Sequence, residues 1–80
     1  MTRYKVFDTI SRLIDENDGD HYYIYVKGHP KPVAVGGFTG YEARTEQDAL
    51  DIIDVDAGTL VGTFDYDSIL AITNYKIFID

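Results

Sequence analysis

The chain has eighty residues and no cysteine, so a single apolar core has to hold its folded state without disulfide support. A chain of this length buries roughly 60% of the surface that it exposes when unfolded. Apolar residues make up 45% of the sequence and aromatic residues 14%, which suits one core and is too much for a disordered segment. No linker, repeat or low-complexity tract divides the chain. We therefore expect one domain over residues 1–80.

The charge of the chain restricts its partners. Fourteen Asp and Glu residues against seven Lys and Arg residues give a formal net charge of −7. Lys and Arg provide most of the affinity for nucleic acid, so we expect no direct binding to nucleic acid or to anionic membranes, whereas a basic protein would be attracted. The N-terminal residues mix charged with apolar side chains and predict neither a signal peptide nor a membrane span. We expect a cytoplasmic protein.

Periodicity predicts the first two elements. Val6, Ile10 and Leu13 recur at helical spacing and predict an amphipathic helix that ends in the turn residues 16–20, ENDGD. Residues 21–28, HYYIYVKG, then alternate in the way that is typical of a β-strand and are rich in aromatic and β-branched side chains.

Two adjacent glycines interrupt the next apolar segment. Residues 32–44 predict a second strand that is interrupted at Gly36 and Gly37. The glycines form either a bulge in one bent strand, which we favour, or a hairpin turn between two strands.

The second half of the chain predicts one more helix and two more strands. Residues 45–48, TEQD, resemble a capping box and lead into residues 48–56, DALDIIDVD, which we predict to be a short helix. Residues 59–64 and 69–79 predict the closing strands, with a turn or a single helical turn at 65–68. The order α-β-β-α-β-β predicts an α+β domain with two helices packed on a mostly antiparallel sheet of about four strands.

Residues that could perform chemistry are few. His21 and His29 lie at opposite ends of the first predicted strand, ~26 Å apart at ~3.3 Å per residue, which is too far for one metal site. The glycine-rich segment at 36–40 lacks the lysine and hydroxyl of a phosphate-binding loop. We predict no catalytic residue, no metal site and no cofactor. A small-ligand-binding or catalytic domain that uses Gly36–Gly40 and His21 remains an alternative.

The acidic residues are the clearest functional feature. On a helix, Asp48, Asp51 and Asp54 would form one exposed row, and negative charge near the C-terminal end would oppose the helix dipole. Locally unfavourable charge of this kind often marks a functional surface. Tyrosine is enriched at the energetic centres of interfaces, so exposed tyrosines are candidate anchors. The predicted partner-binding residues are Asp48, Asp51, Asp54, Asp56, Asp65 and Asp67, with Tyr23 and Tyr25 as anchors.

These features predict a non-enzymatic, acidic binding module that docks on and inhibits a basic, nucleic-acid-binding protein. Closely spaced carboxylates would occupy Arg and Lys sites that are built for phosphates. In size, acidity and lack of catalytic motifs, the chain resembles the small inhibitors encoded by phages and mobile elements, including anti-CRISPR proteins and nucleic-acid mimics. The resemblance implies inhibition of a host defence protein by direct contact. A self-assembling structural subunit that pairs through an open sheet edge, for example as a homodimer, is a further alternative.

Overall fold

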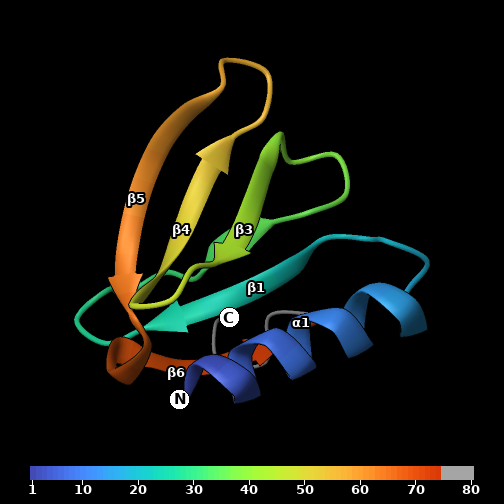
Figure 1. The fold of residues 1–80 in the computed structure, drawn as a ribbon. Coiled ribbons are helices and arrows are strands. Elements are labelled where there is room, and N and C mark those ends of the chain that lie inside the picture. The colour runs from blue at the N-terminus through green and yellow to red at the C-terminus, as the bar shows by residue number, and fades with distance from the viewer. Residues whose placement is uncertain (75–80) are drawn as a thin grey trace.

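Within residues 1–74, the domain consists of one helix packed against two small sheets (Figure 1). The computed structural model describes residues 1–74. In chain order these form α1 (Arg3–Glu16), β1 (Tyr22–Val26), β2 (Val33–Val35), β3 (Tyr41–Thr45), β4 (Ala49–Asp54), β5 (Thr59–Asp65), the 3-10 turn η1 (Tyr66–Ser68) and β6 (Ile69–Thr73).

Both sheets are antiparallel and three-stranded, with the strand orders β2-β1-β6 and β3-β4-β5. Figure 1 shows α1 lying beside the first sheet and β3, β4 and β5 rising away from the helix. Within residues 1–74, this is an α+β domain with one helix and six strands. No helix among these residues is long and apolar enough to span a membrane.

One core joins the helix to both sheets. Alternate residues of β1 are buried, as the sequence pattern predicts, and Val6 and Ile10 are the buried residues of α1. The second sheet contributes Leu50 and Ile52, which are 0% and 1% exposed. Among residues 1–74, the buried apolar residues are Val6, Ile10, Tyr22, Ile24, Val26, Val35, Leu50, Ile52, Tyr66, Ile69 and Ile72.

The predicted first helix is confirmed, together with the turn that ends it. The Thr2 hydroxyl accepts a hydrogen bond from the Lys5 backbone N–H at 3.1 Å and caps the N-terminus of α1. At the other end, the backbone N–H and the side-chain amide of Asn17 both donate to the carbonyl oxygen of Leu13, at 3.0 and 2.8 Å. Asp18 and Gly19 then take positive φ angles, 53° and 76°, and reverse the chain.

The predicted second helix is wrong, because residues 49–54 form strand β4. Leu50 and Ile52 alternate as core residues, and β4 pairs with β3 on one side and with β5 on the other. The two neighbouring strands satisfy the backbone groups of β4, and its β-branched isoleucines suit a pleated strand. The single helical row of Asp48, Asp51 and Asp54 is therefore wrong too, since successive strand residues point to opposite faces.

The predicted bulge at Gly36 and Gly37 is also wrong. Strand β2 ends at Val35, and β3 begins at Tyr41 in the other sheet, so residues 36–40 are a turn between sheets. The alternative of a two-residue hairpin does not describe this turn either, because β2 and β3 belong to different sheets. The single four-stranded sheet of the prediction is replaced by two three-stranded sheets.

The closing strands agree with the prediction where the structure describes them. Strand β5 covers the segment predicted at 59–64, and η1 supplies the predicted helical turn. Strand β6 begins at Ile69 as predicted. The part of the predicted strand beyond residue 74 lies outside the described residues.

Burial of Tyr22 should make the fold sensitive to alkaline pH. Burial raises the pKa of Tyr22 to about 12, and the nearby charge of Glu42 adds to the increase. Tyrosine in an unfolded chain ionises near pH 10. The contribution of the neutral Tyr22 ring to the free energy of unfolding is therefore fully present below pH 10, and it is lost as the pH rises towards about 12. We expect the free energy of unfolding to fall across this interval by on the order of 2 kcal/mol.

Urea titrations at several alkaline pH values measure this effect. In Tyr22→Phe the free energy of unfolding should decline less. Part of the remaining decline is due to Tyr66, because burial raises the pKa of this residue as well. The control Tyr4→Phe changes a ring that is 76% exposed and should leave the decline unchanged. An undiminished decline in Tyr22→Phe would contradict this account.

Candidate partner-binding surface

The structure divides the six predicted acids among three places on the second sheet. Asp48, Asp65 and Asp67 lie near η1, Asp51 lies on β4, and Asp54 and Asp56 lie where β4 turns into β5. Within residues 1–74, none of the six forms an ion pair; the ion pairs there join Arg12 to Asp8, His21 to Asp20 and Arg44 to Glu42.

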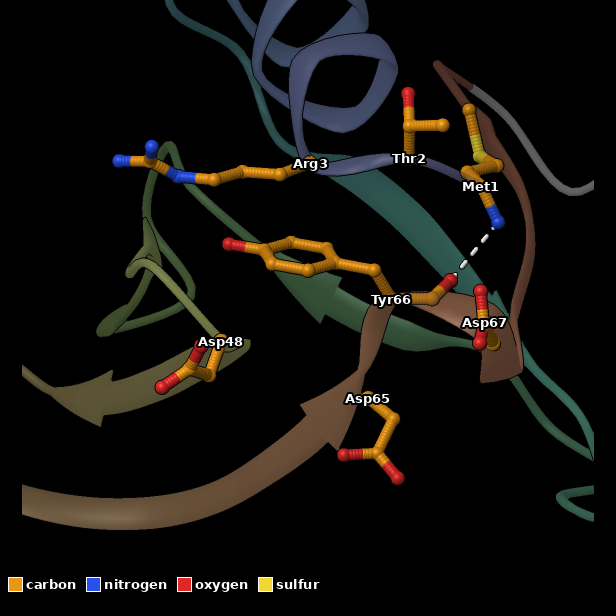
Figure 2. A pocket seen from close by; sticks show the side chains of 7 residues that line it. All are labelled: Met1, Thr2, Arg3, Asp48, Asp65, Tyr66 and Asp67. Atoms are coloured by element: carbon orange, nitrogen blue, oxygen red, sulfur yellow. Dashed lines mark hydrogen bonds between the residues drawn. The ribbon is translucent and has the colours of Figure 1, made fainter.

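Three of the acids meet at a hollow of about 430 Å³ near η1. Asp48 precedes β4, and the pairing of Ala49 with Asp65 brings the start of β4 beside the end of β5. Asp67 belongs to η1, which follows directly. In Figure 2, the carboxylates of Asp48 and Asp65 lie on one side of the Tyr66 ring. We call Asp48, Asp65 and Asp67 the η1 acids.

Two cationic groups share the hollow with the η1 acids. The amino group of Met1 donates hydrogen bonds to the carbonyl oxygens of Tyr66 and Ile69, at 2.8 and 3.1 Å. The guanidinium of Arg3 donates to the carbonyl oxygen of Thr45 at 3.3 and 3.4 Å, and Figure 2 shows it on the opposite side of the Tyr66 ring from Asp48. Among residues 1–74, three negative and two positive groups line the hollow, so most of the formal charge that these residues bring to it is balanced.

Two further acids have partners within the fold. The Asp51 carboxylate accepts a hydrogen bond from the Thr63 hydroxyl at 2.8 Å and lies opposite Arg44 in the strand register. The Asp54 carboxylate accepts the backbone N–H groups of Asp56 and Ala57, each at 3.1 Å. Asp54 therefore stabilises the β4–β5 turn in the way that Asx turns do.

Three turns from distant parts of the chain meet at the other end of β4. The backbone of Gly37 lies against the backbone of His21, and the N–H of Val55 donates to the carbonyl oxygen of Gly40 at 2.9 Å. These contacts join the β2–β3 turn to the α1–β1 turn and to the β4–β5 turn, and in Figure 1 the β2–β3 turn lies between the other two. We call the exposed part of this region the turn surface, consisting of Asp18, Asp20, Phe38, Tyr41, Val55 and Asp56.

The turn surface carries acidic charge, and His21 lies beside one of its acids, Asp20. Three shallow hollows border Phe38, and their lining includes Asp18, Asp20 and Asp56 but, among residues 1–74, no Lys or Arg. Two donors of His21 hold the pKa of the Asp20 carboxyl below its ordinary value: first its backbone N–H at 2.8 Å, then its ring at 3.0 Å. Asp20 is therefore ionised at neutral pH.

A hydrogen-bonded chain runs from Asp20 through His21 to Tyr23. An ionised carboxylate only accepts hydrogen bonds, so the Nδ1 of His21 donates to Asp20. In the neutral imidazole, Nε2 is then an acceptor, and it lies 3.0 Å from the Tyr23 hydroxyl, which donates to it. Both ring nitrogens are occupied by these bonds, so metal binding through Nε2 would require the bond to Tyr23 to break.

The two predicted tyrosine anchors are half-buried on β1. Tyr23 and Tyr25 lie on the face of the first sheet opposite Tyr22, Ile24 and Val26. Tyr23 borders one of the hollows beside Phe38. Among residues 1–74, the most exposed aromatic side chains are Phe38 at 104% and Tyr4 at 76%, and neither was predicted as an anchor from the sequence.

Within residues 1–74, no three His, Cys, Asp or Glu side chains gather in a way that could hold a metal ion. Comparison with protein-family models, with curated proteins and with solved structures gave no match. The function therefore has to be argued from the surface itself.

The geometry of the turn surface depends on Gly37. This residue has φ +55°, and a Cβ built on it would lie 2.8 Å from the His21 backbone nitrogen. We expect Gly37→Ala to lower the free energy of unfolding by about 2–4 kcal/mol, because backbone strain and a backbone clash add up. Urea unfolding measures the change.

Gly58→Ala is the matched control. Gly58 also has a positive φ, +68°, but an added Cβ would meet nothing within 4 Å. The free energy of unfolding of this variant should therefore fall by only about 1 kcal/mol, because backbone strain is the sole cost. Equal losses in the two variants would show that the contact between residues 37 and 21 does not constrain the turn.

Proposed function

We propose that this protein is a non-enzymatic binding module that docks through its turn surface on a basic, nucleic-acid-binding protein and inhibits it. The observation that carries the proposal is the gathering of Asp18, Asp20 and Asp56 from two separate turns around an exposed apolar centre, where the described residues that line the hollows include no Lys or Arg. An excess of charge of one sign attracts and orients a partner of the opposite sign.

The overall charge supports the same proposal. A chain of eighty residues with a net charge of −7 repels nucleic acid and attracts basic surfaces along most approach directions. Carboxylates on a rigid scaffold can occupy Arg and Lys sites that otherwise bind phosphates, which lie one per ~3.4 Å along each DNA strand. This mode of action is the one implied by the resemblance to small acidic inhibitors of phages and mobile elements.

The η1 acids have a secondary place in this proposal. Met1 and Arg3 balance much of their charge, and Asp51 and Asp54 are engaged by Thr63 and by the backbone. Asp56 is thus the sequence-predicted acid that lies on the turn surface.

A pull-down with matched charge variants tests the proposal. The triple variant Asp18→Asn, Asp20→Asn, Asp56→Asn removes three charges from the turn surface while keeping the side-chain shapes. The control Asp48→Asn, Asp65→Asn, Asp67→Asn removes the same number from the η1 end. We expect the wild type and the control to retain basic proteins from a nuclease-treated cell lysate, and the turn-surface variant to lose them.

Competition shows whether the captured proteins use a nucleic-acid site. Proteins held by the wild type should be released by excess duplex DNA and by added salt, because both weaken exposed charge pairing at such a site. Equal capture by the wild type and the turn-surface variant would contradict the proposal, as would captured proteins that DNA does not release. Loss of capture in the η1 variant alone would place the contact on the η1 acids instead.

A further inference from the structure

Phe38 is the most exposed large apolar side chain among the described residues. Its relative exposure is 104%, so its ring contacts almost nothing within the fold. It lies in the GGFTG segment, between Gly37 and Thr39. A turn needs no aromatic side chain at this place, and exposing one forgoes the free energy that burying it would provide.

The turn that carries Phe38 is nevertheless held firmly. The N–H of Gly36 donates to the carbonyl oxygen of Tyr41 at 2.9 Å. The N–H and the hydroxyl of Thr39 both donate to the carbonyl oxygen of Gly36, at 3.1 and 2.8 Å. The Thr39 hydroxyl also accepts the N–H of Tyr41 at 3.2 Å. The backbone on both sides of Phe38 is thereby fixed, so a contact made by its ring costs little ordering of the chain.

The surroundings of Phe38 indicate what can cover it. The hollows on its flanks are lined by Asp18 and Asp20 on one side and by Asp56 on another. A surface that encloses the ring must place its own rim against these carboxylates. Lys and Arg at that rim would be paired, whereas a second copy of this chain or an anionic membrane would bring like charges together.

We propose that Phe38 is the anchor of the interface: its ring enters an apolar pocket on the partner protein, and Lys or Arg side chains at the rim of that pocket pair with Asp18, Asp20 and Asp56. This inference rests on the proposed function and specifies the chemistry of the partner. An aromatic residue at the centre of a charged contact is the usual arrangement at the energetic centre of an interface.

Two designed peptides of equal charge test the anchor. One is a helical peptide of Leu and Lys, whose apolar face is bordered by lysines, and in the other every Leu is replaced by Ser. Calorimetry should show that the wild type binds the Leu/Lys peptide at least about tenfold more tightly than the Ser/Lys peptide. Phe38→Ala should lose this preference, and Leu70→Ala, which changes a side chain that is 63% exposed on β6, should keep it.

A tryptophan probe reports the contact directly, because the chain contains no tryptophan. The emission of Phe38→Trp should shift to shorter wavelength when the Leu/Lys peptide is added and should stay unchanged with the Ser/Lys peptide. Leu70→Trp should respond to neither peptide. Far-ultraviolet circular dichroism of each variant checks that the fold is intact.

The outcomes separate this inference from the proposed function. Binding of both peptides with equal affinity, weakened by the turn-surface Asn variant, would overturn the anchor and leave the acidic docking surface in place. Binding of neither peptide would count against both. Flotation with phosphatidylcholine vesicles that depends on Phe38 would assign the ring to a membrane, and self-association that depends on Phe38 would assign it to a second copy; either result overturns the inference.

Discussion

The close approach of Gly37 to the backbone of His21 is the constraint on which the rest of the structure depends. At this point the chain leaves the first sheet and enters the second, and a Cβ at residue 37 would lie 2.8 Å from the His21 nitrogen. Gly36 makes a similar approach to the Tyr22 ring, since a Cβ at residue 36 would lie 3.1 Å from a carbon of that ring. Because both residues lack a side chain, the β2–β3 turn can lie directly on the start of β1.

That contact also determines which parts of the surface come together. The β2–β3 turn is fixed on His21, and the hydrogen bond from Val55 to Gly40 joins the β4–β5 turn to it. Acids that are separated by more than thirty residues in the sequence thus flank one exposed phenylalanine. The surface is a product of the fold and not of any continuous acidic segment.

The sequence predicted the elements whose periodicity is unambiguous. The apolar spacing of α1 and the alternation of β1 each fit one period only, and both elements formed as predicted. Residues 48–56 fit two periods, since aspartate at every third position suggests a helix while Leu50 and Ile52 alternate as a strand does. The strand conformation of these residues is stabilised by β3 and β5, which pair with β4 on both sides. Tertiary pairing of this kind is not visible in a local pattern.

The site was harder to predict than the fold for the same reason. Acidic character could be recognised from composition, but the partners that engage Asp51 and Asp54 belong to β5 and to the hairpin backbone. Phe38 was not among the predicted residues, because glycine on one side and threonine on the other indicate a turn whose role lies in its backbone. The sequence did contain a signal for this residue, because Phe38 lies in a turn and belongs to no helical or strand pattern of apolar residues.

The central claim is that the three turns form one rigid surface that presents Phe38. NMR of the labelled protein tests it most directly, through backbone relaxation of residues 36–40 and nuclear Overhauser effects between the turns. The account predicts order parameters near the rigid value of about 0.85, with cross-peaks linking Val55 to Gly40 and Gly37 to His21. Order parameters below about 0.6 in this segment, or the absence of those cross-peaks, would contradict it.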